Sequence, residues 1–132
     1  MTIGSVNIRG LTYLKVLLLL EIENFDVLCV QETWMAAGAT APAIPGYHVV
    51  EQRHEIGTHG GLATYYRQSL QLENTKGNKY GLYTKLILPT SELANIINIY
   101  LPPISSLARR HITETEATDK LELVLEGLQP QF

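Results

Sequence analysis

Two polar residues follow short apolar runs near the N-terminus, and their side chains can bind a metal ion. Asn7 comes after Val6, and Glu32 comes just after an apolar run that ends at Gln31. Carboxylate and amide oxygens suit a hard ion such as Mg²⁺, which also keeps places for water and phosphate oxygens. Tyr100, much later in the chain, adds a hydroxyl that can contact a phosphate. Together these residue types suit part of a site that binds a metal ion and stabilises negative charge building on oxygen atoms.

Each of these residues also has a simpler interpretation when it is taken alone. A Glu after a strand is usually a solvated loop charge, and an Asn in the same position is usually a turn former. Tyr100 would usually be a half-buried aromatic residue of a strand. Only the combination of the three residues favours a functional site.

Hydrophobic periodicity predicts the elements that position the first two residues. Ile3–Ile8 is rich in residues that favour extended structure and is followed by Gly10, which indicates a strand. Leucines at helical spacing predict a helix over Leu11–Glu23 that ends at Asn24, and Asp26–Gln31 has the continuous apolar pattern of a buried strand. These elements form a βαβ unit with parallel strands and a right-handed crossover. The carboxyl ends of such strands collect functional residues.

The rest of the chain is predicted to add strands and one more helix. An irregular loop is expected over Thr33–Gly46, which is rich in Ala, Gly and Pro. Further strands are predicted at Tyr47–Gln52, Gly61–Arg67, Leu82–Leu88 and Leu93–Leu101. The last two are joined by a hairpin connection over residues 89–92. A helix is predicted from about Thr115 to Leu128. This order of elements indicates a mixed-sheet α/β protein.

Four sequence blocks resemble the endonuclease/exonuclease/phosphatase superfamily. The first two are Ser5–Leu11, in which a strand ends in Asn before a Gly-Leu helix start, and Val27–Trp34, which contains Gln-Glu-Thr. The other two are Gly60–Arg67, similar to the Gly-Gly-Val-Ala strand, and Asn98–Pro103, similar to the Asn-Ile-Tyr-x-Pro strand end. Within the superfamily the chain looks most like the apurinic-type endonuclease domain of LINE-type (non-LTR) retrotransposons.

The resemblance implies a DNase I-like α/β fold. Residues 1–132 would form the N-terminal part of one domain, half of a four-layer α/β sandwich made of a mixed β-sheet with flanking helices. The implied activity is DNA nicking by phosphodiester hydrolysis, with Mg²⁺ as the cofactor, or Mn²⁺ in its place, and an end that primes reverse transcription. The resemblance makes Glu32 the metal-binding Glu, places Asn7 around the metal and nucleophile, and brings Tyr100 to the scissile phosphate.

Three further residues are candidates for contacts with DNA. Arg9 stands two residues after Asn7, where many family members carry Asp or Asn. Pointing outward it would contact a DNA phosphate, whereas pointing inward it would disfavour metal binding. Trp34 would either stack on the substrate or pack over the neighbouring loop, and Arg67 lies in a stretch with a slight excess of basic residues.

Length is the main departure from the family pattern. Family domains are much longer, and their second half supplies an Asp-x-Asn strand end, a further Asp and a terminal Asp-His pair. Asn7, Glu32 and Tyr100 do not include a recognisable general base. We therefore expect a catalytically incomplete fragment with an uncovered, apolar inner sheet face. The missing C-terminal half, or a following reverse-transcriptase region, would be its partner.

Two classes of function stay open at this point. The chain is either a fragment of an enzyme, or a non-catalytic remnant or nucleic-acid-binding module. Within the enzyme class, an apurinic repair endonuclease or a phosphoesterase acting on small phosphates shares the same first-half motifs. The Cys-Val-Gln-Glu-Thr-Trp and Tyr-Leu-Pro-Pro sequences favour the retrotransposon branch.

Composition excludes several classes of protein. A net charge of −3 over 132 residues argues against a protein that binds nucleic acid mainly by being basic. The lone cysteine, Cys29, lies in an apolar run, which predicts a buried, inert thiol and a reducing compartment. No secretory signal or membrane-spanning segment is expected. The resemblance implies an intracellular or nuclear location, although the chain has no run of Lys and Arg typical of nuclear import.

Overall fold

A strand, a helix and a second strand open the fold, as the sequence predicts. They are seen in a computed structural model that describes residues 1–36, 38–53, 60–78 and 80–100. Strand β1 spans Ile3–Asn7, helix α1 spans Tyr13–Glu23 and strand β2 spans Val27–Gln31. β1 and β2 are parallel, with Asn7 beside Gln31 at their carboxyl ends. The predicted βαβ unit is confirmed.

Helix α1 begins and ends at residues with recognisable capping chemistry. The Thr12 hydroxyl accepts a hydrogen bond from the Lys15 amide at 3.3 Å, which satisfies one of the free donors of the first turn. Asn24 ends the helix in the left-handed conformation, with φ of 52°, and its amide donates to the Leu20 carbonyl at 3.0 Å. The helix therefore stops just before β2.

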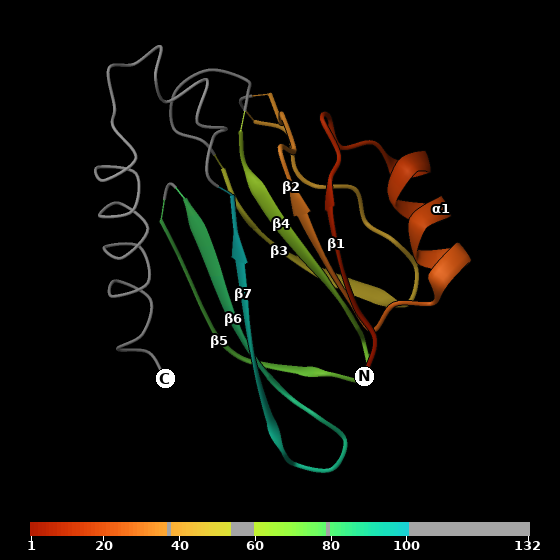
Figure 1. Cartoon of the computed structure of the whole chain (residues 1–132), viewed down its shortest axis with the longest axis vertical. Coiled ribbons are helices and arrows are strands. Elements are labelled where there is room, and N and C mark those ends of the chain that lie inside the picture. Colours follow the sequence, from red (N-terminus) through yellow and green to blue (C-terminus); the bar gives the residue numbers. More distant parts are fainter. Residues whose placement is uncertain (37, 54–59, 79, 101–132) are drawn as a thin grey trace.

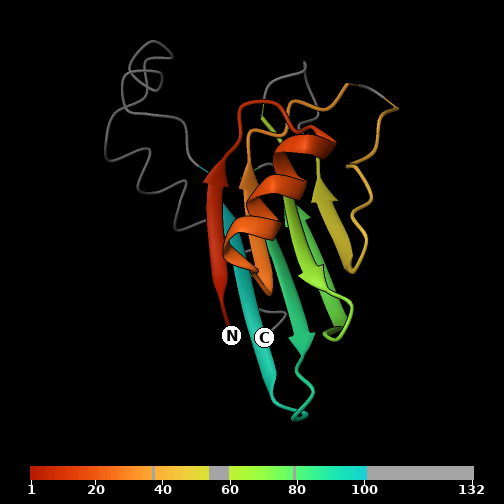
Figure 2. The same cartoon turned by 90° about the vertical axis from the view of Figure 1, so that its right-hand side faces the viewer.

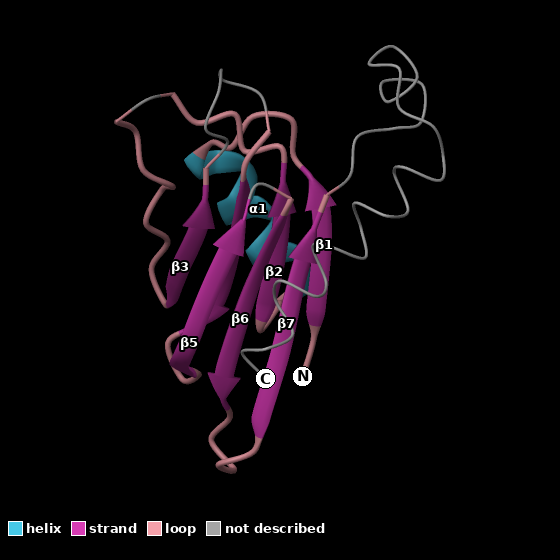
Figure 3. Cartoon of the chain, turned by 90° about the vertical axis from the view of Figure 1, so that its left-hand side faces the viewer, coloured by secondary structure: helices cyan, strands magenta, loops and turns pink. Residues whose placement is uncertain are grey.

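Seven strands form two sheets in the described part of the chain. The first sheet has the order β1-β2-β4-β3, with β3 (Tyr47–Gln52) antiparallel to β4 (Leu62–Arg67). The second sheet has the order β5-β6-β7, built from β5 (Gln71–Asn78), β6 (Gly81–Ile87) and β7 (Leu93–Ile99). Helix α1, the first sheet and the second sheet lie as three successive layers (Figure 1). Figures 2 and 3 show the molecule from opposite sides. Helix α1 lies across the first sheet in Figure 2, and the second sheet faces the viewer in Figure 3.

Strand β5 is the element that the sequence does not predict. Its residues are mostly polar and exposed, so neither apolar alternation nor a continuous apolar run marks it. It is an outer strand that pairs with β6 from Gln71 opposite Ile87 to Asn78 opposite Gly81. Tertiary pairing therefore decides its conformation. The helix predicted at 115–128 lies outside the described residues.

Two apolar clusters hold the three layers together. The first packs α1 on one face of the first sheet and includes Val16, Leu20, Leu28 and Tyr65. The second lies between the two sheets and consists of Val27, Cys29, Tyr66, Leu70, Leu86 and Ile96, all buried. Alternate residues of β2 serve the two clusters because successive side chains of a strand point to opposite faces.

The second sheet corrects the expectation of an uncovered inner sheet face. That face of β2 and β4 packs against β6 and β7 of the same chain, and Val27 and Leu86 are fully buried in the contact. Exposed apolar side chains gather on the outer side of α1 instead. They are Tyr13, Leu14, Leu18 and Ile22. Among the described helices, none is both long and apolar enough to cross a membrane.

The Cys29 thiol is expected to be unreactive in the folded chain. Burial raises its pKa to about 11, against a smaller lowering by a hydrogen bond with Thr64. At pH 8 only about one thiol in a thousand would be the nucleophilic thiolate, and the side chain is also enclosed. Labelling with a disulfide reagent should be slow in buffer and fast in denaturing urea. Equal rates in the two conditions would contradict the burial of Cys29.

Candidate active site

The carboxyl ends of β1 and β2 continue side by side into the loops that carry the candidate residues. Beyond the strands, the Ile8 amide donates to Gln31 at 3.0 Å and the Gly10 amide donates to Glu32 at 2.9 Å, in both cases to the backbone carbonyl. On the other side, the Trp34 amide donates to the Gly60 carbonyl at 3.0 Å. The segment around Glu32 is therefore held by backbone hydrogen bonds on both sides.

Three residues of these loops have backbone angles that non-glycine residues seldom adopt. The φ angles of Arg9, Glu32 and Trp34 are 48°, 54° and 52°, all in the left-handed region. Such conformations cost about 1–3 kcal/mol each and are typical of functional sites, where the surrounding structure imposes them. Lys15 contributes by donating from Nζ to the Gly10 carbonyl at 2.9 Å. The loops are thus held in one strained arrangement.

The end of β7 brings Tyr100 to Glu32. The Tyr100 hydroxyl donates a hydrogen bond to Glu32 Oε1 at 3.1 Å. The Tyr100 backbone amide donates to the Tyr80 carbonyl at 3.2 Å, so its position is tied to the second sheet. Burial raises the pKa of the Tyr100 phenol, and the hydrogen bond to Glu32 and the charge of Glu32 raise it further. The phenol is therefore protonated at neutral pH and acts as a hydrogen-bond donor.

Asn7 and Arg9 act on the same phenol. A side-chain hydrogen bond with Asn7 and the positive charge of Arg9 both lower the pKa of Tyr100, against the larger effects of burial and Glu32. The Arg9 charge therefore reaches the site. Four of the six residues predicted from the sequence, Asn7, Arg9, Glu32 and Tyr100, come together at the carboxyl ends of β1, β2 and β7.

The other two predicted residues have different surroundings. Trp34 lies beside Gly10, with its Cε3 3.3 Å from where a Cβ on Gly10 would stand, and it is 36% exposed. Arg67 is at the opposite end of the first sheet, next to the start of β2. Its guanidinium donates to Asp26 Oδ1 at 3.0 Å and to the Asn24 carbonyl at 3.1 Å, and it lies over the Tyr47 ring. The structure does not bring Arg67 to the other candidates.

Comparison with known proteins assigns the chain to a family. The sequence pattern of the Endonuclease/Exonuclease/phosphatase family matches residues 4–128. The chain belongs to this family. Its fold is similar to the crystal structure of the Xenopus laevis APE2 catalytic domain, with a TM-score of 0.61, 17% sequence identity, and coverage of 78% of this chain and 46% of that chain. The chain thus spans less than half the length of that domain. No curated protein matches the sequence.

The comparisons confirm the superfamily resemblance and the DNase I-like α/β fold. The family match does not single out a branch, so the LINE-type assignment stays a prediction. Members of the endonuclease/exonuclease/phosphatase family are generally metal-dependent and usually use Mg²⁺.

The residues at the site are suited to supply some of the ligands of such a metal centre. Glu32 is half-buried, and its Oε1 accepts the bond from Tyr100. Its second oxygen, Oε2, would be the one to bind a cation, and Asn7 adds an amide oxygen on the neighbouring strand. Mg²⁺ is commonly bound through only one or two carboxylates and keeps several waters. Across the described residues, no three His, Cys, Asp or Glu side chains are grouped to hold an ion. Glu32 would supply a carboxylate to such a centre, with further ligands coming from elsewhere.

Sequence reasoning assigned no role to two buried amides next to the site, Gln31 and Asn98. Both are polar residues within strands whose inward-facing neighbours are apolar, and that contrast is the signal that could have found them. Gln31 directly precedes Glu32, and Asn98 is two residues before Tyr100.

Gly61→Ala is expected to destabilise the chain and to disturb the Glu32 segment. Gly61 has φ of 92°, and an added Cβ would overlap the hydroxyl of the buried Thr33. Strain and overlap together should lower the free energy of unfolding by about 2–3 kcal/mol. Gly46→Ala is the matched control, because Gly46 has φ of 87° with nothing within 4 Å of the added Cβ. Equal losses in urea unfolding would show that the contact with Thr33 is unimportant.

Proposed function

We propose that this chain is the N-terminal half of a Mg²⁺-dependent endonuclease domain that nicks DNA, of the type found in LINE-type retrotransposons. The observation that carries the proposal is the contact between the Tyr100 hydroxyl and Glu32 Oε1 at 3.1 Å, with Asn7 and Arg9 beside it. Family membership supports phosphoester hydrolysis, and the Cys29–Trp34 and Tyr100–Pro103 sequences support the retrotransposon branch.

Each residue of the group has a chemical role in this proposal. Glu32, with the Asn7 amide oxygen, would hold Mg²⁺, which when bound acts as a Lewis acid on a phosphate oxygen. Tyr100 keeps its proton at neutral pH, and with substrate bound its hydroxyl would turn from Glu32 to donate a hydrogen bond to a non-bridging phosphate oxygen as negative charge builds there. Arg9 adds positive charge at the same place and favours the approach of a DNA phosphate.

The group does not complete a hydrolytic site by itself. Hydrolysis needs a base that activates water and an acid that assists the leaving oxygen, and neither Asn7, Glu32 nor Tyr100 is free to act as the base. In the proposal a C-terminal half supplies these groups. β1 and β7 are outer strands of the two described sheets, and an outer strand can offer backbone groups to a further strand.

A plasmid-nicking assay tests the proposal. Supercoiled DNA is incubated with Mg²⁺ and either the 132-residue chain or the same chain extended through the second half of the domain. We expect nicked circles only with the extended protein. Nicking by the 132-residue chain alone would contradict the claim that it is incomplete. If the extended protein cleaves only at abasic sites, a repair-type activity replaces the retrotransposon assignment. Hydrolysis of small phosphate esters without any nicking would overturn the endonuclease proposal.

A further inference from the structure

A pair of buried amides joins the two sheets directly beneath the site. Asn98, on β7, is 1% exposed, and Gln31, at the end of β2, is 8% exposed. The surrounding inter-sheet cluster is apolar, with Ile96 on the same face of β7. A buried amide in such surroundings is costly unless all of its polar atoms find partners. The location of both residues next to Glu32 and Tyr100 raises the question of what they position.

The Asn98 amide is fully used in contacts with the first sheet. Its Nδ2 donates to the Ala63 carbonyl at 2.9 Å, to the Val30 carbonyl at 3.2 Å and to Thr64 Oγ1 at 3.3 Å. Its Oδ1 accepts a hydrogen bond from Gln31 Nε2 at 2.9 Å. One side chain of β7 is therefore bonded to both β2 and β4.

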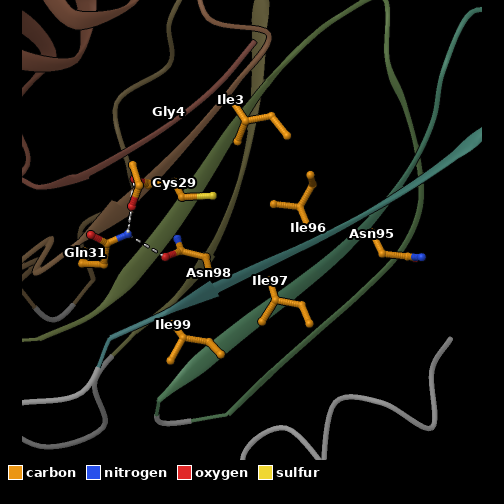
Figure 4. A pocket seen from close by; sticks show the side chains of 10 residues that line it. Ile3, Gly4, Cys29, Gln31, Asn95, Ile96, Ile97, Asn98 and Ile99 are labelled. Atoms are coloured by element: carbon orange, nitrogen blue, oxygen red, sulfur yellow. Dashed lines mark hydrogen bonds between the residues drawn. The ribbon is translucent and has the colours of Figure 1, made fainter. Parts of the chain in front are cut away.

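Gln31 extends the connection to β1. Its Nε2 donates to Ser5 Oγ at 2.9 Å as well as to Asn98 Oδ1 (Figure 4). The three side chains run from the first strand of the fold to the last described strand. Gln31 and Asn98 lie against an apolar groove lined by Ile3, Ile97 and Ile99, but their polar atoms are directed at each other.

These bonds permit only one register of β7 against the first sheet. A shift of β7 by one residue would turn Asn98 to the outer face and bring Ile97 or Ile99 inward. A shift by two residues would place Ile96 or Tyr100 against the carbonyls of Val30 and Ala63 and take the Asn98 amide away from its partners, at a cost of about 1–3 kcal/mol. Either shift would also move Tyr100 away from Glu32.

We propose that Asn98 is a positioning residue that holds the Tyr100 phenol against the Glu32 carboxylate. It does so by bonding β7 to Val30, Ala63 and Gln31. Gln31 directly precedes Glu32, and Asn98 itself is two residues before Tyr100. The geometric part of the inference does not depend on the activity. Its consequence for catalysis rests on the proposed function.

The test measures the coupling between Tyr100 and Glu32 in the 132-residue chain. Tyrosines labelled with ¹³C at the ring are observed by NMR at neutral pH, and the Tyr100 signal is assigned with Tyr100→Phe. In the parent, Glu32→Gln should shift the Tyr100 ring signal, because it changes the group that accepts the hydrogen bond from the phenol. In the Asn98→Ala background the Tyr100 signal should already be displaced, and Glu32→Gln should no longer shift it. The other tyrosine signals, which report on the fold as a whole, should keep their positions.

Matched variants make the outcome decisive. Asn95→Ala removes an amide from the opposite face of β7, where Asn95 accepts a hydrogen bond from the Tyr83 hydroxyl, and should leave the response to Glu32→Gln intact. Asn98→Ser keeps one polar group toward the first sheet and replaces Asn98→Ala in the same test if Asn98→Ala does not fold. A folded Asn98 variant that keeps the full response to Glu32→Gln would overturn the inference.

Activity separates this inference from the proposed function. In the extended domain, Asn98→Ala should reduce the nicking rate about tenfold through misplacement of Tyr100, with little change for Asn95→Ala. If the NMR coupling depends on Asn98 but the extended domain does not nick DNA, the positioning role stands and the endonuclease proposal fails. If the extended domain nicks DNA equally well with Asn98→Ala, the catalytic consequence is wrong.

Discussion

Glu32→Gln is expected to abolish DNA nicking by the extended domain while the fold stays intact. Gln keeps an oxygen that can accept the hydrogen bond from Tyr100, so the free energy of unfolding should change by less than about 1 kcal/mol. The substitution removes the Glu32 carboxylate, which in the proposal binds the metal ion. Loss of a group that stabilises charge in the transition state typically lowers the rate about 10²–10³-fold. The nicking rate at saturating Mg²⁺, with urea unfolding as the check on folding, measures both effects.

Glu92→Gln provides the control for this prediction. Glu92 is exposed in the turn between β6 and β7, and its backbone carbonyl, which the substitution keeps, accepts the hydrogen bond from Leu88. The extended domain with Glu92→Gln should nick DNA at the parent rate. If Glu32→Gln nicks as fast as Glu92→Gln, Glu32 is not the metal ligand, and the proposed site is wrong at its central residue.

Leu86→Ala is expected to cause the largest loss of stability of any substitution proposed for this chain. Leu86 is fully buried in the cluster between the two sheets. Removal of a buried leucine side chain costs about 2–5 kcal/mol, from the lost transfer of apolar surface and the cavity that remains. Since small domains are stable by only about 5–15 kcal/mol, the variant should lose a large part of its stability. Urea unfolding followed by tyrosine fluorescence measures the loss.

Leu93→Ala separates burial in the sheet contact from the general effect of a shorter side chain. Leu93 lies at the same end of the β6–β7 pair as Leu86, opposite Ile87, but it is 50% exposed. Its replacement should cost less than about 1 kcal/mol. Similar losses for both variants would mean that the second sheet does not pack on the first in solution. The original expectation of an uncovered inner face would then be correct.

The elements around the site could be predicted because their signals lie within short windows of sequence. The apolar run of β2 and the leucine spacing of α1 are local patterns, and the boundaries seen in the structure differ from the predicted ones by no more than two residues. Thr12 and Asn24 cap α1 through bonds to residues three and four positions away. The sequence motifs also pointed to Asn7, Glu32 and Tyr100 as site residues, through their combination and not through any one of them alone.

Strand β5 could not be predicted because its conformation depends on a partner. Its mostly exposed, polar residues carry no periodicity, and hydrogen bonds with β6 hold it extended. The same limit applies to Arg67. Its charge suggested a DNA contact, whereas its position beside Asp26 and Asn24, at the far end of the sheet from Glu32, follows from the antiparallel direction of β4.

The sequence by itself determined the βαβ opening, the family and the residue types of the candidate site. Only the tertiary structure decided that Glu32 and Tyr100 meet, since they are 68 positions apart and belong to different sheets. Their contact requires one register between the sheets, which the Asn98 amide and the apolar cluster around Leu86 define together. Such a register depends on desolvation and hydrogen bonding between distant segments, and no local pattern in the chain encodes it.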